Sequence, residues 1–131
     1  MVERLELGDM VGDYRRWRLQ LGQALDPRYH NQEWLDWMVM GGRAMCFSTG
    51  DCAVVAELRY YPSGAKDVFV ICAAGDPIAT RDVLAPRLEQ WAKAEGCLAI
   101  MAESREAWIR LLSGVGWKLY KTAMRKDMCD G

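Results

Sequence analysis

The chain has 131 residues, enough for a single hydrophobic core, and we expect residues 1–131 to form one domain. Hydrophobic residues make up 51% of the sequence and charged residues 27%, a globular composition that excludes a mainly disordered chain. The formal net charge of -1 gives no electrostatic reason to expect a nucleic acid as partner, because phosphate binding needs clustered, unbalanced cations.

The first part of the chain predicts one strand and two helices. The stretch Val2–Leu7 alternates imperfectly between apolar and polar residues and predicts an edge strand. From Asp13 to Leu25 the apolar residues recur at helical spacing, which predicts an amphipathic helix. A second helix is expected over Asn31–Met40, with either His30 or Asn31 as its N-cap.

The middle of the chain predicts an antiparallel meander followed by a helix. Arg43–Ser48 and Cys52–Tyr61 are predicted strands joined by a turn-forming triplet, and Val68–Ala73 is a third. The following helix runs towards Glu95. Since a proline inside a helix removes a hydrogen bond and crowds the preceding turn, Pro86 either kinks this helix or marks the start of its regular part.

The last third of the chain predicts a crossover unit. Cys97–Ala102 is a second apolar run, and two apolar strands joined by a helix favour parallel pairing with a right-handed connection. Arg105–Ser113 predicts a short helix with an apolar face, and Trp117–Arg125 predicts a final strand.

Cysteine and histidine indicate neither a metal site nor a nucleophilic apparatus. The five cysteines include no C-x-x-C pair and mostly lie in apolar segments, which predicts reduced thiols in a cytosolic protein. His30 is the only histidine, no metal-ligand spacing is present, and we interpret it as a capping or surface residue. We also expect no signal peptide, because the N-terminus is charged and lacks an apolar core region. No membrane span is expected, because no apolar run is long enough to cross a bilayer.

The order of these elements, together with the segment Glu103–Trp117, resembles the GNAT (Gcn5-related N-acetyltransferase) superfamily. In that superfamily the helix after the fifth strand ends in a glycine and an aromatic residue, which Gly116-Trp117 matches. Trp108 and Arg110 particularly resemble small GNAT-like proteins of bacteriophages, some of which are carried in the virion or the genome-ejection apparatus. The resemblance implies an α/β (α+β) fold: a mixed, mostly antiparallel central sheet with helices on both faces and one parallel strand pair.

The resemblance implies acyl transfer from coenzyme A to an amine, but the loop that would bind the pyrophosphate departs from the family pattern. That pattern is Arg or Gln, two residues, Gly, any residue, then Gly or Ala, whereas Ala73–Arg81 contains one glycine, Gly75. Asp76 is placed to cap the following helix, and its negative charge would repel the negatively charged pyrophosphate. Pro77 lacks an N–H donor. Gly75 and Arg81 remain the candidate cofactor contacts.

The groups that the resemblance implies for proton transfer are also replaced. Leu112 stands where the family commonly has a tyrosine that protonates the departing thiolate, and Arg105 replaces an asparagine. Tyr120 is then the candidate acid, and Glu57 or Glu103 is the candidate base. A purely structural role stays open for each of these residues, because carboxylates on strands mostly face solvent and an aromatic residue on a strand often points into the core.

We therefore weigh two functions. The favoured one is a non-catalytic GNAT-fold protein that binds no cofactor and acts on other proteins, as an interaction component or a virion-associated structural or ejection component of a bacteriophage. The alternative is an acyl-CoA-dependent N-acyltransferase that uses acetyl-CoA to acetylate a primary amine of a small molecule or a protein. The first is favoured because both the phosphate loop and the thiolate acid are missing. It predicts a location in the cytoplasm of a bacterial host or in a phage virion.

Overall fold

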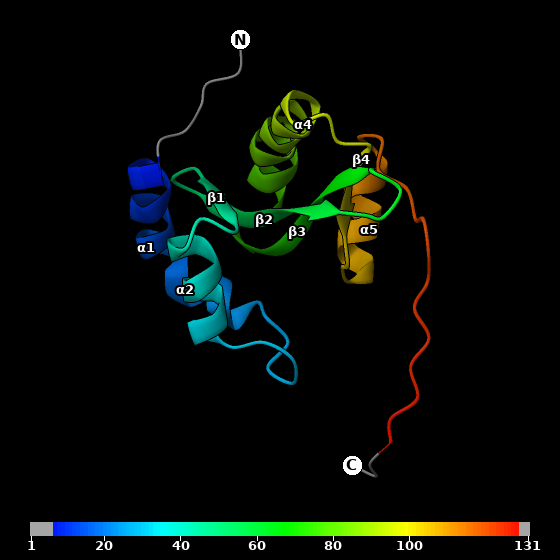
Figure 1. Ribbon diagram of the computed structural model, residues 1–131, viewed down its shortest axis with the longest axis horizontal. Coiled ribbons are helices and arrows are strands. Elements are labelled where there is room, and N and C mark those ends of the chain that lie inside the picture. Colours follow the sequence, from blue (N-terminus) through cyan, green and yellow to red (C-terminus); the bar gives the residue numbers. More distant parts are fainter. Residues whose placement is uncertain (1–6, 129–131) are drawn as a thin grey trace.

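The computed structural model describes residues 7–128, with side chains from residue 12 onward, and shows helices packed on a four-stranded sheet (Figure 1). The elements in chain order are α1 (Leu7–Gln23), α2 (Gln32–Met40), β1 (Met45–Ser48), β2 (Cys52–Tyr60), β3 (Lys66–Gly75), α3 (Pro77–Ala79), the π-helix η1 (Thr80–Leu84), α4 (Ala85–Ala94), β4 (Ala99–Ala102) and α5 (Glu106–Ser113).

The strands lie side by side in the order β1-β2-β3-β4. β1, β2 and β3 form the expected antiparallel meander, and β4 pairs with β3 in parallel. The helical segment from α3 to α4 connects these two parallel strands, which is the predicted crossover unit. The predicted mixed, mostly antiparallel sheet with one parallel pair is therefore confirmed.

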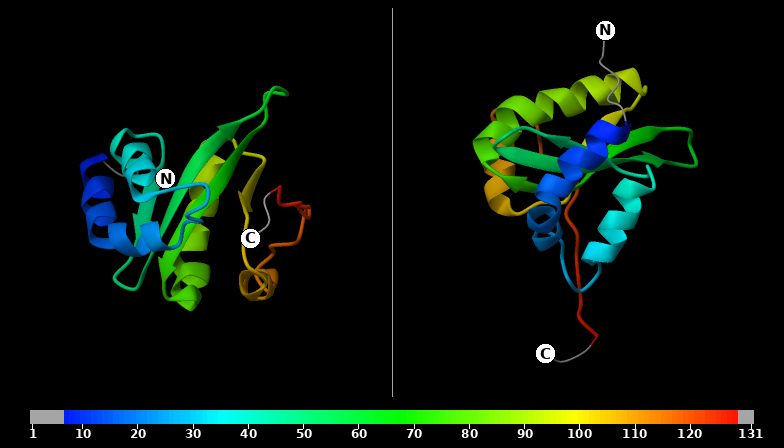
Figure 2. Two further views of the ribbon diagram at one scale, coloured as in Figure 1. Left: turned by 90° about the horizontal axis from the view of Figure 1, so that it is seen from below. Right: turned by 90° about the vertical axis from the view of Figure 1, so that its left-hand side faces the viewer.

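Helices cover both faces of the sheet and bury one hydrophobic cluster on each. The views in Figure 2 show α1 and α2 on one side and α4 on the other. On α1, Tyr14 and Leu21 lie two turns apart and are both buried against the sheet. On the other face Leu84, Leu88 and Ala92 recur every four residues and pack on β2 and β3. Successive side chains of a strand point to opposite faces of the sheet, so the strands contribute residues to both clusters. The sheet therefore lies at the centre of the domain.

The two N-terminal helices begin at Leu7 and Gln32. α1 begins at Leu7, six residues before the predicted start; the predicted edge strand Val2–Leu7 otherwise lies outside the described residues. α2 is capped as expected, because the Asn31 side chain accepts a hydrogen bond from the Trp34 N–H at 2.9 Å. The exposed His30 stacks on the Trp34 ring, with 4.2 Å between ring centres.

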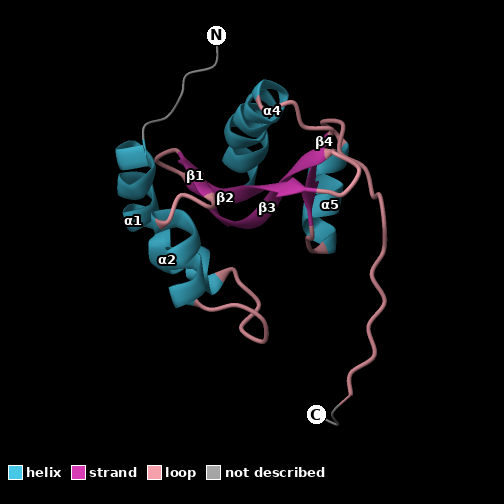
Figure 3. Cartoon of the chain, in the orientation of Figure 1, coloured by secondary structure: helices cyan, strands magenta, loops and turns pink. Residues whose placement is uncertain are grey.

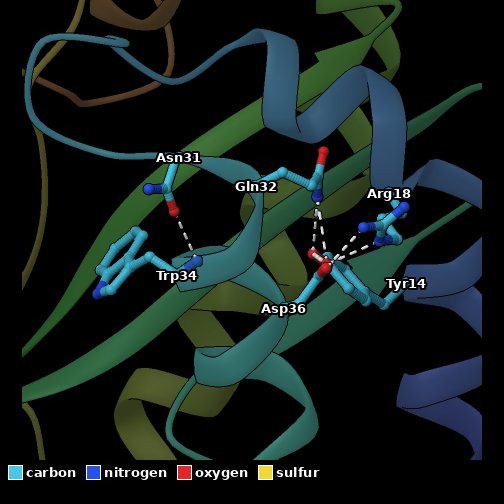
Figure 4. Close-up of polar contacts among 6 residues, drawn as sticks. All are labelled: Tyr14, Arg18, Asn31, Gln32, Trp34 and Asp36. Atoms are coloured by element: carbon cyan, nitrogen blue, oxygen red, sulfur yellow. Dashed lines mark hydrogen bonds and ion pairs between the residues drawn. The ribbon is translucent and has the colours of Figure 1, made fainter.

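A partly buried polar cluster joins α1 to α2 (Figure 4). The Tyr14 hydroxyl donates to Asp36 Oδ1 at 2.5 Å, and the Arg18 guanidinium donates to both Asp36 oxygens at 2.8 and 2.7 Å. The Gln32 amide donates to Asp36 and to the Tyr14 hydroxyl, each at 3.2 Å. Through these contacts the two helices that cover one face of the sheet are held in a fixed relative position.

The helix that follows β3 is irregular before its proline. η1 is a π-helical turn, and the regular helix α4 begins at Ala85 with Pro86 next to it in the first turn. The Ala85 N–H donates to the Thr80 carbonyl, so the helical segment is continuous, and Pro86, which has no N–H, directly follows the π turn in which the regular hydrogen-bond ladder is already interrupted. The second of the two expectations for Pro86 is therefore the one that the structure bears out, with the irregularity placed in the π turn.

The predicted strand Trp117–Arg125 is wrong. Residues 117–127 have no regular secondary structure and run beside and then away from the sheet as a loop (Figure 3). The sequence there has strand-forming residues, but a strand exists only when it is hydrogen-bonded to a neighbour. Among the described residues no strand pairs with the outer edge of β4.

Candidate functional site

A β-bulge distorts the centre of β3. Neighbouring residues Val55 and Ala56 of β2 face Cys72 and Val70 of β3, so Ile71 is an extra residue on β3. Ile71 and Cys72 consequently both contact the cluster under α1 and α2, which breaks the alternation of the strand. A bulged residue is not paired in the ladder, and bulges are common next to binding sites, where they leave backbone groups free for other partners.

The two parallel strands separate at this bulge. The β3–β4 ladder runs from Asp67 opposite Ala99 to Val70 opposite Ala102, and it ends one residue before Ile71. β3 continues to Gly75 paired only with β2, while the chain after Ala102 leads to α5. In sheets with parallel strands, the crevice beyond the carboxyl ends of the strands is a common place for ligands.

A cleft of about 540 Å³ occupies the place where β3 and β4 separate. Its floor is the second half of β3, one wall is the loop after β4 with the inner side of α5, and the other wall is contributed by α1 and by the helix that follows β3. The residues that line it include Gln20 and Gln23 of α1, Ile71 and Cys72 of the bulge, and Trp108 and Leu112 of α5.

The loop at one end of the cleft carries Asp76 as a helix cap. The Asp76 carboxylate accepts a hydrogen bond from the Ile78 N–H at 3.1 Å, and its main-chain oxygen accepts from the Thr80 N–H and hydroxyl at 3.1 and 2.9 Å. Pro77 has no N–H to offer. The helix start therefore has few free donors for an anion and presents a carboxylate in addition.

The two candidate cofactor contacts occupy different surroundings. Gly75 lines the cleft and has φ +93°, and a side chain there would collide with the Asp51 main-chain oxygen and the Cys52 Cα. Its glycine is thus required by packing, whether or not a ligand binds. Arg81 is not among the residues that line the cleft, and its guanidinium donates to Asp82 at 2.7 Å.

The three candidate acid and base residues are not brought together. Glu103 lines the cleft, at the start of the loop after β4. Glu57 lies on β2 and pairs with Arg59 at 3.1 Å, and Arg59 in turn stacks on Phe69. Tyr120 is 70% exposed and lines a second groove on the outer side of β4. Only Glu103 of these three is therefore positioned to meet a molecule in the cleft.

Other polar groups line the cleft that the sequence analysis did not propose as site residues. Cys72 lies in its floor, and burial together with the nearby Cys46 raises the pKa of the Cys72 thiol to about 12, so it is protonated and not nucleophilic at neutral pH. Ser104 and Arg105 stand beside Glu103 in the wall. Their position directly after the carboxyl end of a parallel strand is the signal that could have identified them.

Among residues 7–128, no group of three or more His, Cys, Asp or Glu side chains is arranged to hold a metal ion. In the same part of the chain, no helix combines the length and the apolar character needed to cross a bilayer.

The fold is similar to that of solved acetyltransferases, although the sequences differ widely. An acetyltransferase from Trypanosoma brucei is 15% identical with a TM-score of 0.60, and the match covers 95% of this chain and 96% of that one. Glucosamine-6-phosphate N-acetyltransferase from Arabidopsis thaliana is 12% identical, covers 97% of each chain and has a TM-score of 0.58. A predicted acetyltransferase from Clostridium acetobutylicum, solved with acetyl-CoA, is 9% identical, covers 95% of this chain and 93% of its own, and has a TM-score of 0.59.

No protein-family model matches the sequence, and no curated protein is significantly similar to it. The likeness to the solved structures nevertheless extends over almost the whole chain. Together with the mixed sheet, the parallel pair that separates at a bulge and the helices on both faces, it shows that the chain has the GNAT fold.

Proposed function

We propose that this chain is a GNAT-type N-acyltransferase that moves an acyl group from a coenzyme A thioester to an amine held in the cleft. The observation that carries the proposal is the cleft itself, which opens where β3, with its bulge at Ile71, separates from β4. The cleft has the size of a small-molecule site and combines an apolar floor with a few polar groups in its walls.

The residues of the cleft fit the two halves of coenzyme A unequally. The apolar floor and the bulged, unpaired backbone suit a narrow acyl-pantetheine chain that needs hydrogen bonds to main-chain groups. The Asp76 loop suits a pyrophosphate poorly, because its carboxylate already occupies the Ile78 N–H and adds a negative charge. We therefore expect weak binding of the donor, which would supply the acyl group in activated form as a thioester.

Glu103 is the residue of this chain that would handle the proton of the acceptor. When the amine nitrogen bonds to the acyl carbon and the carbon–sulfur bond breaks, the amine releases a proton that a carboxylate in reach can accept. Glu103 lies in the cleft wall, whereas Glu57 is paired with Arg59 and Tyr120 lies outside the cleft. This assignment leaves Glu103 as the proposed base and assigns no side chain as the acid.

A second candidate is a GNAT-fold protein that binds no coenzyme A and acts through contacts with other proteins. The observation that favours it is the same Asp76 cap, which removes donors from the place where the family binds phosphates. The association with bacteriophages and the virion location stay predictions from the sequence.

Thermal unfolding with and without acetyl-CoA, followed by an assay of thiol release with a set of primary amines, separates the two candidates. A ligand at about a hundred times its dissociation constant stabilises the folded state by about 2.7 kcal/mol, which raises the unfolding temperature of a domain this size by several degrees. Such a rise together with amine-dependent thiol release supports the enzyme. If neither occurs at millimolar acetyl-CoA, the enzyme proposal is wrong and the second candidate stands.

A further inference from the structure

The cleft between β3 and β4 carries one negative and one positive side chain. Of the described residues that line it, only Glu103 and Arg105 are charged, and both belong to the loop between β4 and α5. They lie two positions apart, so their Cα atoms are separated by about 7 Å or less. The carboxylate and the guanidinium are therefore close enough to contact the same small molecule.

Neither of these two charges has a charged partner in its own chain. Within residues 12–128, no side chain forms an ion pair with Glu103 or Arg105, and the two do not pair with each other. Arg105 is the N-cap residue of α5, but its side chain makes no capping hydrogen bond. Both side chains are exposed and are available to a ligand that carries the opposite charges.

The α1 wall of the cleft is polar but uncharged. Gln20 and Gln23 lie three positions apart on α1, which places them on the same side of the helix, and both are exposed in the cleft. An amide side chain offers two N–H donors and a carbonyl acceptor. This wall can therefore bind polar groups of an acceptor without changing the balance of charge.

The balance of charge in the cleft distinguishes between classes of amine. A polyamine, or a sugar with several amino groups, needs several carboxylates, and the described lining of this cleft has one. An amine without an acidic group leaves Arg105 unused. A molecule with one amine and one carboxylate matches both residues, because Glu103 meets the nitrogen and a guanidinium can donate two parallel hydrogen bonds to a carboxylate.

The size and the apolar surface of the cleft favour a small acceptor. A volume of about 540 Å³ is that of a single small-molecule site, and the pantetheine arm of the donor takes up part of it. Trp108 and Leu112 of α5 line the same wall as Glu103 and Arg105 and offer apolar surface to an aliphatic side chain. A free amino acid fits the remaining space better than a large molecule does.

We propose that the acceptor is a small apolar amino acid, with its carboxylate bound by Arg105 and its amine next to Glu103. The proposal rests on the acyltransferase function proposed above and names its substrate class. The amine nitrogen bonds to the acyl carbon as the carbon–sulfur bond breaks, the proton of the nitrogen passes to Glu103, and the thiolate takes a proton from water. The products are an N-acyl amino acid and the free thiol.

Three related amines test the substrate class in the wild-type protein. Leucine, leucinamide and isoamylamine share an aliphatic skeleton and carry a carboxylate, a neutral amide or neither group. Thiol release from acetyl-CoA gives the rate with each amine, and mass spectrometry identifies the acetylated product. Because only leucine can form the charged contact with Arg105, we expect its kcat/KM to exceed that of either other amine by about tenfold or more.

Arg105→Gln tests the residue that would hold the carboxylate. We expect the KM for leucine to rise about tenfold or more, while kcat and the KM values for leucinamide and acetyl-CoA stay unchanged. Arg105→Lys keeps the charge without the planar fork and should recover part of the loss. Arg110→Gln is the matched control, because Arg110 is an exposed residue of α5 that does not line the cleft, and it should change none of these values.

Three outcomes would overturn this inference while the acyltransferase stands. Equal kcat/KM values for leucine and leucinamide mean that the carboxylate is not recognised. A higher KM for acetyl-CoA in Arg105→Gln means that the arginine binds the phosphates of the donor instead. Equal effects of Arg105→Gln and Arg110→Gln mean that only net charge matters. Absence of thiol release with every amine is a different result, because it overturns the acyltransferase and this inference together.

Discussion

The carboxylate of Asp36 accepts a hydrogen bond from the Tyr14 hydroxyl at 2.5 Å, although the two residues lie on different helices and 22 positions apart. Tyr14 is 1% exposed, so its hydroxyl has no access to water as a replacement partner. Arg18 donates to both oxygens of the same carboxylate. This contact holds α1 and α2 together over the face of the sheet on which Gln20 and Gln23 reach the cleft.

The first prediction concerns this cluster. Asp36→Ala leaves the Tyr14 hydroxyl and the Arg18 guanidinium with fewer partners, and we expect the free energy of unfolding to fall by about 2–3 kcal/mol. Asp82→Ala breaks the exposed pair with Arg81 and should cost less than about 1 kcal/mol. Urea unfolding at neutral pH measures both. Equal losses in the two variants would contradict the structural role of Asp36.

The same cluster predicts a pH dependence. The hydrogen bonds from Arg18, and to a lesser degree those from Tyr14 and Gln32, lower the pKa of Asp36 below its ordinary value of 3.8. A carboxyl group whose pKa is lower in the folded state than in the unfolded state stabilises the fold at pH values above its unfolded-state pKa. This stability is lost as the pH falls from about 4 through the lowered folded-state pKa. Asp36→Asn should therefore flatten the acid limb of a stability profile measured between about pH 5 and pH 2.

The two glycines Gly75 and Gly64 give a matched test of packing against backbone strain. Both have positive φ, +93° and +88°, but a side chain on Gly64 meets nothing within 4 Å, whereas one on Gly75 collides with backbone of residues 51 and 52. Gly64→Ala should cost about 1 kcal/mol for its conformation alone. Gly75→Ala should cost about 3 kcal/mol or more, because the neighbouring backbone must move. Similar unfolding midpoints for the two variants would contradict this assignment.

Asp76→Asn should strengthen the binding of acetyl-CoA. Asparagine caps a helix as well as aspartate does, so the fold is kept while one negative charge is removed from the loop at the end of the cleft. Isothermal titration should show a dissociation constant about tenfold lower at low ionic strength, with the difference shrinking in salt. Glu33→Gln, which removes the same charge from the exposed first turn of α2, should leave the affinity unchanged. An effect of equal size in both variants would mean that only net charge matters.

Glu103→Gln should lower the rate of amine-dependent thiol release by about a hundredfold, as expected for the loss of a base. Glu106→Gln is the control, because Glu106 is an exposed carboxylate three residues further along the chain and does not line the cleft. Steady-state kinetics at several amine concentrations separate the rate from the binding of the acceptor. A Glu103→Gln enzyme with full activity would remove Glu103 from the proposed chemistry.

Most of the fold followed from local sequence signals, because each element has a pattern that its neighbours reinforce. The N-cap Asn31, the meander turns and the crossover between two apolar runs each combine a local rule with burial. The start of α1 was placed too late, since Gly8 and Gly12 interrupt the helical pattern at a cost of only about 1 kcal/mol each, which the rest of the helix overcomes.

The features that make the site could not be read from the sequence, because they depend on pairing between distant residues. The bulge at Ile71 exists only in the register of β3 against β2, and nothing in the run Val68–Ala73 marks it. The absence of a strand over Trp117–Arg125 has the same origin, since strand propensity does not supply a neighbour. Glu103 was identified because it follows an apolar run, which is a local signal.

β4 is joined to the sheet by a ladder of only four residue pairs. Native proteins open locally where few contacts must be broken, and a short strand at a sheet edge belongs to this low-stability class. β4 and α5 together should therefore exchange their amide hydrogens well before the meander does. Because this unit forms one wall of the cleft, its opening and closing sets how readily a ligand enters, and any ligand that spans β3 and β4 should slow the exchange of both.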